Sequence, residues 1–83
     1  MRVHIRLFAS HREILGADRL DVELPVGASV ADLVDVIAER VPGVKRTLGS
    51  TRFAVNREYA SSTTILHEGD EVALIPPVAG GRD

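Results

Sequence analysis

The last thirteen residues of the chain read Glu71-Val72-Ala73-Leu74-Ile75-Pro76-Pro77-Val78-Ala79-Gly80-Gly81-Arg82-Asp83. The segment from Glu71 to Ile75 is apolar after its first residue, which is typical of a short buried strand. Pro76 and Pro77 end that strand because neither can donate a ladder hydrogen bond. The remaining residues are small or charged and can bury little surface. The pattern predicts one folded domain over residues 1–76 and a flexible, projecting tail over residues 77–83.

Two segments near the N-terminus, residues 3–7 and 20–24, alternate between apolar and polar side chains. This period of two predicts two strands with one buried face each. Between them, residues 10–15 predict a single helical turn with Ser10 as its N-cap and Gly16 at its end. Phe8 follows the first strand on the parity of its polar side chains, so we expect its ring to be exposed.

One segment has the pattern of a full helix. Ser29 predicts its N-cap, and Asp32 places a carboxylate in the first turn, where the helix dipole favours negative charge. Pro42-Gly43 predicts its end. The apolar residues between these signals recur at helical spacing and predict one buried stripe: Val30, Leu33, Val34, Ile37, Ala38 and Val41.

The second half of the chain predicts strands and turns. Phe53-Ala54-Val55 indicates a short strand, and Asn56 begins a tight turn because it tolerates positive φ. For residues 59–65 the sequence does not decide between a loop and a brief strand. Strands with one main helix predict an α+β domain in which a mixed sheet of four or five strands packs on that helix, the β-grasp or ubiquitin-like arrangement. A ferredoxin-like fold would need a second full helix.

Composition excludes several classes of function. The 83 residues allow one domain, and a formal net charge of −2 argues against nucleic acid as the main partner. Without cysteine the chain has no disulfide and no thiol nucleophile. No apolar run approaches the roughly 20 residues of a membrane span, so we expect no membrane partner and a cytoplasmic location. The histidines, His4, His11 and His67, lack metal-ligand spacing and are predicted at the surface without a metal.

The Gly80-Gly81 pair indicates a backbone that enters a narrow passage, because only glycine lacks a Cβ. The six residues that follow Ile75, up to Gly81, can extend about 20 Å, enough to cross the wall of a partner's active site. The predicted threading segment is Pro77, Val78, Ala79 and Gly80. Phe8 and Ile75 are the predicted docking residues on the sheet surface beside it, and a place in the core is the open alternative for Ile75.

Several stretches resemble the MoaD/ThiS family of ubiquitin-like sulfur carriers. They are Phe8-Ala9 with Arg12-Glu13 and Gly16, then Ala54-Val55-Asn56, and finally Gly69-Asp70-Glu71-Val72-Ala73 leading to Pro76-Pro77-Val78-Ala79-Gly80-Gly81. The resemblance implies a sulfur-carrier small subunit of molybdopterin synthase that is not catalytic alone. It further implies that a MoeB-type, E1-like enzyme uses ATP to adenylate Gly81, which then becomes a thiocarboxylate.

The resemblance also implies the later steps and partners. The tail would enter a MoaE-type large subunit, in a heterotetramer, and donate sulfur to cyclic pyranopterin monophosphate for the molybdenum cofactor. The small subunit itself would bind no cofactor. Members of the family end at the second glycine, whereas this chain continues with Arg82-Asp83. We therefore expect a processing peptidase to remove these two residues.

Two alternatives stay open at this point. A ubiquitin-like modifier would be joined to target lysines through the same Gly81. A sulfur carrier of the same chemistry could instead serve thiamine or cysteine synthesis.

Overall fold

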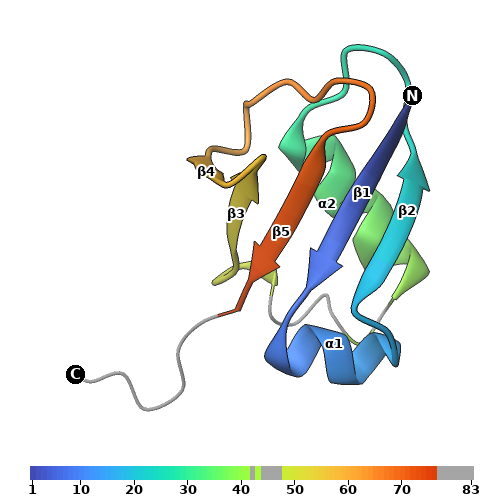
Figure 1. The fold of residues 1–83 in the computed structure, drawn as a ribbon, viewed down its shortest axis with the longest axis vertical. Coiled ribbons are helices and arrows are strands. Elements are labelled where there is room, and N and C mark those ends of the chain that lie inside the picture. Colours follow the sequence, from blue (N-terminus) through green and yellow to red (C-terminus); the bar gives the residue numbers. More distant parts are fainter. Residues whose placement is uncertain (42, 44–47, 77–83) are drawn as a thin grey trace.

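Strand β1 (Arg2–Leu7) directs Val3, Ile5 and Leu7 to the inner face of the sheet, where they are almost completely buried. The computed structural model describes residues 1–41, 43 and 48–76. Five strands form one sheet in the order β2-β1-β5-β3-β4, and helix α2 covers one of its faces (Figure 1). The remaining elements are α1 (Ala9–Leu15), β2 (Arg19–Glu23), α2 (Val30–Arg40), β3 (Arg52–Val55), β4 (Glu58–Ala60) and β5 (Glu71–Ile75).

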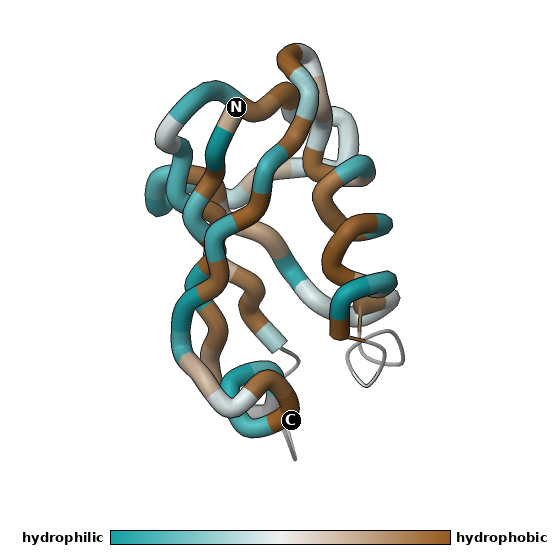
Figure 2. Tube along the Cα trace, turned by 90° about the vertical axis from the view of Figure 1, so that its right-hand side faces the viewer, coloured by the Kyte–Doolittle hydropathy of each residue, from teal (hydrophilic) through white to brown (hydrophobic). Residues whose placement is uncertain are grey.

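The sheet is mixed, as predicted. Strands β1 and β5 run parallel at its centre, and the pairs β1–β2, β3–β5 and β3–β4 are antiparallel. The first and last strands of the chain thus become central neighbours, and the inner side chains of both are buried. Hydrophilic and hydrophobic residues alternate along β1, which starts at the N-terminus (Figure 2). The sequence prediction of a β-grasp with one main helix is therefore confirmed.

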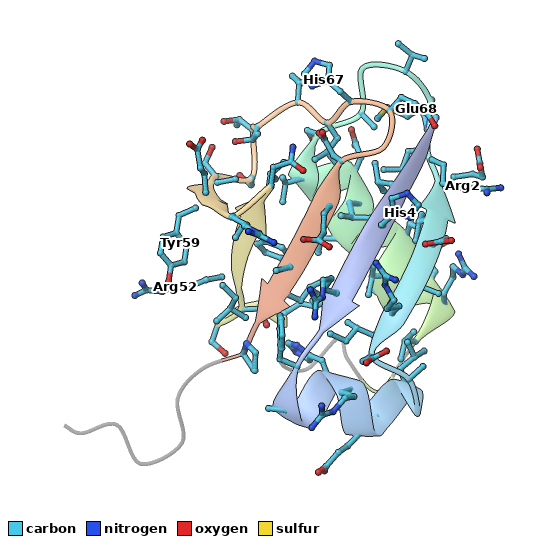
Figure 3. All side chains as sticks on the ribbon, viewed as in Figure 1. Arg2, His4, Arg52, Tyr59, His67 and Glu68 are labelled. Atoms are coloured by element: carbon cyan, nitrogen blue, oxygen red, sulfur yellow. The ribbon has the colours of Figure 1, made fainter. Side chains whose placement is uncertain are left out.

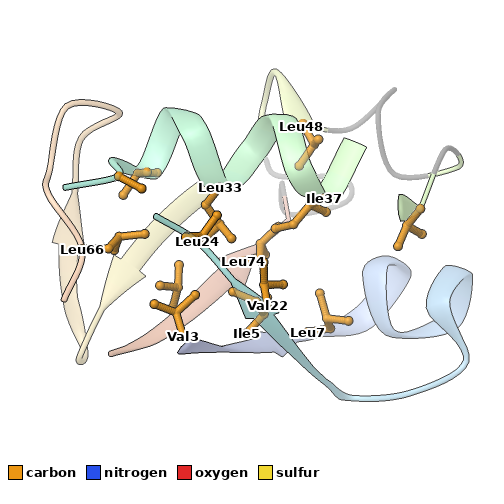
Figure 4. Close-up of a cluster of buried hydrophobic side chains, with 14 residues drawn as sticks. Val3, Ile5, Leu7, Val22, Leu24, Leu33, Ile37, Leu48, Leu66 and Leu74 are labelled. Carbon is orange, nitrogen blue, oxygen red and sulfur yellow. The ribbon is translucent and has the colours of Figure 1, made fainter. Parts of the chain in front are cut away.

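The core lies between α2 and the inner face of the sheet (Figure 4). Leu33 and Ile37 project from the helix onto Ile5, Val22 and Leu74 of the strands, and all five are at most 2% exposed. Burial of a leucine or isoleucine side chain contributes roughly 1.5–3 kcal/mol each, so this contact holds the helix on the sheet. The predicted helical stripe is confirmed for Val30, Leu33, Ile37 and Val41, which are buried, while Val34 and Ala38 are half-buried.

Helix α2 begins as the sequence predicts. The Asp32 N–H donates to the Ser29 hydroxyl at 3.4 Å, and the Ser29 N–H donates to the Asp32 carboxylate at 2.9 Å. This reciprocal exchange satisfies two of the N–H groups that have no partner at a helix start. Val41 follows the last helical residue, so the helix stops before Pro42.

The Ser29 cap yields a testable stability difference. Ser29→Ala is expected to lower the free energy of unfolding by about 1 kcal/mol, because the Asp32 N–H loses its acceptor. Denaturant unfolding of both proteins measures the change, and the exposed Ser62→Ala provides a matched control. An unchanged free energy of unfolding would contradict a stabilising cap.

The prediction for α1 is wrong at its start. The helix begins at Ala9, one residue before the predicted cap Ser10, and Phe8 is its N-cap without a side-chain hydrogen bond. The Phe8 carbonyl accepts the N–H groups of His11 and Arg12 at 3.1 and 3.4 Å, so the first turn closes around Phe8. The predicted end is confirmed, because Gly16 adopts φ 83° and its N–H donates to the Arg12 carbonyl oxygen.

The turn between β3 and β4 is tied to the start of β5. Asn56 has φ 51°, as predicted. Its side-chain oxygen accepts the Glu71 N–H at 3.0 Å, and its side-chain NH₂ donates to the Asp70 carboxylate at 2.9 Å. The segment left open in the sequence, residues 59–65, overlaps strand β4, which starts one residue earlier, is only three residues long and forms an edge of the sheet. In the part of the chain that the structure describes, no helix is long and apolar enough to cross a membrane.

Candidate functional site

The face of the sheet opposite α2 is turned toward the viewer in Figure 3, and no helix of the described residues lies over it. The strand register decides which side chains share this outer face. Ala73 of β5 pairs with Arg6 of β1 on one side and with Ala54 of β3 on the other. Ala54 in turn pairs with Tyr59 of β4, so these four side chains form a row across the sheet.

A second row lies one step closer to the end of β5. Ile75 pairs with Arg52, and Phe8 continues the outer face of β1 because its backbone is still extended, at φ −127° and ψ 157°. Phe8 is 39% exposed and Ile75 is half-buried. We call the apolar members of the two rows the outer patch: Phe8, Ala54, Tyr59, Ala73 and Ile75.

The outer patch has small side chains at its centre and aromatic rings on both sides. Ala54 and Ala73 are small and lie between the Phe8 ring on one side and the Tyr59 ring, which is 73% exposed, on the other. An exposed apolar surface of this form is typical of a protein contact, because aromatic side chains supply much of the binding energy of interfaces. The structure thus places both predicted docking residues, Phe8 and Ile75, on one face next to the end of β5. Their role in docking stays a prediction.

The charges around the outer patch belong mainly to arginines. The Arg6 guanidinium lies over the Phe8 ring, 5.5 Å from its centroid, and 3.9 Å from the Glu71 carboxylate. Both contacts are consistent with a partly desolvated cation held over an aromatic face. Arg52 is exposed beside Tyr59 at the edge of the sheet (Figure 3).

The predicted tail lies outside the described residues. Strand β5 ends at Ile75 and Pro76 is the last residue described, so the predicted end of the strand is confirmed. The predicted domain boundary after residue 76, the threading residues Pro77, Val78, Ala79 and Gly80, and the reactive Gly81 all stay predictions.

The prediction of three surface histidines is wrong for His11. His67 is exposed and His4 is half-buried, and the hydrogen bond from the His4 ring, whose Nδ1 lies 2.8 Å from the Asp21 carboxylate, lowers the pKa of Asp21. His11 is completely buried, with its Nε2 3.4 Å from the Thr51 hydroxyl. Helix α1, which carries His11, packs under the end of the sheet. The local sequence around His11 did not reveal this burial. Among residues 1–41, 43 and 48–76, no group of three or more His, Asp or Glu side chains could hold a metal ion.

Burial of His11 predicts how stability depends on pH. Burial lowers the pKa of His11, and a hydrogen bond to the Leu74 backbone opposes the shift. An unfolded histidine, with a pKa of about 6.5, therefore binds its proton before the folded one as the pH falls. The contribution of His11 is fully present above the unfolded pKa and is lost as the pH falls through the folded pKa.

We therefore expect His11→Val to flatten the decline of the free energy of unfolding between about pH 7 and pH 5. Urea unfolding at a series of pH values measures this slope. The exposed His67→Gln is the matched control and is expected to keep the slope of the parent. A slope in His11→Val equal to that of the parent would show that another group titrates.

Sequence reasoning missed three members of this face and its cations. Ala54 and Ala73 stand on the outer parity of their strands, and their small size in otherwise large apolar strands was the available signal. Tyr59 lay in the segment that was left open. Arg6 and Arg52 carried no signal in sequence, because their position beside the outer patch depends on the pairing of distant strands.

The sheet order, the single main helix on one face and the free outer face define a ubiquitin-like β-grasp protein. The model of the ThiS family matches residues 5–81, and the chain belongs to this family. It is 37% identical over 82 residues to the molybdopterin synthase sulfur carrier subunit of Mycobacterium tuberculosis, covering 98% of this chain and 99% of the relative.

Two solved structures are also similar. SAMP1 from Haloferax volcanii superposes with a TM-score of 0.87 at 29% identity, covering 98% of this chain and 100% of that chain. The second is a complex of subunits 1 and 2 of the molybdopterin-converting factor from Helicobacter pylori. It matches with a TM-score of 0.70 at 27% identity and covers 98% of this chain and 100% of the matched chain.

Proposed function

We propose that this chain is the sulfur-carrier subunit of a molybdopterin synthase and that Gly81 carries the sulfur as a thiocarboxylate. The observation that carries the proposal is the family match, which runs through the whole domain and ends at Gly81. The similarity to a molybdopterin synthase sulfur carrier subunit over nearly the full length of both chains supports the same pathway.

The proposed chemistry needs a free carboxylate at Gly81. That carboxylate attacks the α-phosphorus of ATP, pyrophosphate leaves, and an acyl adenylate forms. A sulfur nucleophile from a donor then adds to the acyl carbon and AMP leaves, which yields the thiocarboxylate. The chain has no cysteine, so it cannot hold sulfur as a persulfide, and its terminal carboxyl is the available carrier. A glycine acyl group also presents the least steric hindrance to attack.

The outer patch has the role of a docking surface in this proposal. It holds the domain against a partner while the tail, which follows β5 directly, reaches the partner's active site. The complex of subunits 1 and 2 of the molybdopterin-converting factor supports a large-subunit partner for this chain. The large subunit would supply the catalytic groups that pass sulfur to cyclic pyranopterin monophosphate.

Three further parts of the proposal concern other molecules. An E1-like enzyme of the MoeB type binds and uses the ATP, while this chain binds no cofactor. A peptidase removes Arg82-Asp83, because a peptide bond at Gly81 leaves no carboxylate there. The cytoplasmic location expected from the sequence also belongs to the proposal.

A second candidate is a protein modifier that is joined to lysines through Gly81. The observation that favours it is the close structural similarity to SAMP1, which is also described as a small archaeal modifier protein. Both functions share the activation of a glycine carboxylate, so they differ in the nucleophile that accepts the acyl group: sulfide in the carrier and a lysine amine in the modifier.

Intact-mass analysis of the protein isolated from its own cells tests the proposal. We expect a species that has lost Arg82-Asp83 and carries one sulfur in place of one oxygen. Lysate is examined in parallel for stable isopeptide adducts, which the modifier would form. Full-length protein without any thiocarboxylate, together with such adducts, would overturn the carrier function in favour of the modifier.

A further inference from the structure

Two arginine–aromatic pairs stand on opposite sides of the outer patch. On the β1 side, the Arg6 guanidinium stacks over the Phe8 ring at 5.5 Å. On the β4 side, Arg52 and Tyr59 lie next to one another in Figure 3, and both line a hollow at the β3–β4 edge of the sheet beside the outer patch. The floor between them consists of the small side chains Ala54 and Ala73, with Ile75 beside Arg52. The patch is thus an apolar surface with small side chains at its centre and a cation at each side.

These cations stand out against the other charges of the same face. Arg2 pairs with Glu23 at 3.0 Å, so this arginine, on the part of the face away from the patch, has a close carboxylate partner. Arg6 has only a long contact to Glu71, at 3.9 Å, and remains 44% exposed. Within the part of the chain that the structure describes, Arg52 makes no ion pair. The arginines at the outer patch therefore lack a close carboxylate partner among the described residues.

The chain as a whole is acidic, with a formal net charge of −2. A local positive surface on an acidic protein orients its approach to an acidic partner surface, since net charge alone would repel such a partner. Arginine is suited to this role because its planar guanidinium binds a carboxylate with two hydrogen bonds and still stacks on an aromatic ring.

From this arrangement we propose that the outer patch binds a partner surface made of an apolar side chain with a carboxylate on each side of it. The apolar side chain packs on Ala54 and Ala73, and the carboxylates pair with Arg6 and Arg52. The inference rests on the proposed function, since the partner is the large subunit of the synthase. It adds the chemistry by which that subunit recognises this chain.

The test measures binding of the purified large subunit, from the same organism, to the parent chain and to Arg52→Gln, Arg6→Gln and the double variant. Arg57→Gln is the matched control, because it removes the same charge from the β3–β4 turn, at the other end of β3 from Arg52. Binding is measured at about 0.1 M and about 1 M salt, between which the screening length falls from about 10 Å to about 3 Å. Melting curves verify that each variant is folded.

At the lower salt concentration we expect each single variant to bind about three- to fivefold more weakly and the double variant about tenfold or more. At the higher concentration these differences should shrink, and Arg57→Gln should match the parent within about twofold at both. If Arg6→Gln disturbs the fold through its contact with Glu71, Arg52→Gln alone decides the outcome.

Two results would overturn the inference in different ways. If the parent binds and the Arg52 variant binds equally well at the lower salt concentration, or the Arg57 variant is weakened as much, the cationic sides do not recognise the partner. The proposed function would then stand. If the folded parent fails to bind the large subunit at either concentration, the proposed function falls and the inference falls with it.

Discussion

A chain that ends at Gly81 is expected to be adenylated at least about 100-fold faster than the chain that ends at Asp83. ATP activation requires a free carboxylate at a fixed distance from the docked domain. In the longer chain the terminal carboxylate belongs to Asp83, two residues farther along. A passage that fits glycine would also exclude the Arg82 side chain sterically, and a dry passage adds the desolvation cost of its guanidinium.

The assay follows acyl-adenylate formation and then the mass of the thiocarboxylate, with purified E1-like enzyme. A chain that ends at Gly80 is the matched control, because it has a free glycine carboxylate one residue too early. Gly81→Ala in the shortened chain is expected to slow transfer more than it weakens docking, since the added methyl group displaces the reacting carbon. Equal rates for the chains ending at Gly81 and Asp83, without cleavage, would show that processing is not needed.

Removal of either large apolar side chain next to the end of β5 is expected to weaken binding to the large subunit. Phe8→Ala and Ile75→Ala should each cost about 2 kcal/mol of binding free energy, roughly 30-fold in the dissociation constant. Phe8 is exposed, so its variant should keep the stability of the parent. Ile75 is half-buried, so its variant should lose some stability as well.

Titration calorimetry with the purified large subunit measures both dissociation constants. Val26→Ala is the matched control, because Val26 is 90% exposed but lies outside the outer patch. It is expected to bind like the parent. Unchanged affinity in both the Phe8 and Ile75 variants would remove the outer patch from the account of docking.

Much of the fold could be predicted from local pattern. The alternation in β1 and β2, the cap at Ser29 and the glycine at residue 16 each act through neighbouring residues, so their effects can be read along the chain. Errors arose where the determining contact was distant. His11 was assigned to the surface with the other two histidines because none has metal-ligand spacing, yet its ring packs beside Thr51, forty residues away.

The candidate site also has a part that local sequence could predict and a part that depends on distant contacts. Backbone chemistry and local period were sufficient to predict the exposed position of Phe8 and the end of β5 before Pro76, and they are the basis of the prediction for the Gly80-Gly81 pair. That Phe8, Ala54, Tyr59, Ala73 and Ile75 form one surface between Arg6 and Arg52 became visible only in the folded chain. The physical reason is that the register between β1, β5, β3 and β4 joins residues that are far apart in the chain, and no local pattern encodes that pairing.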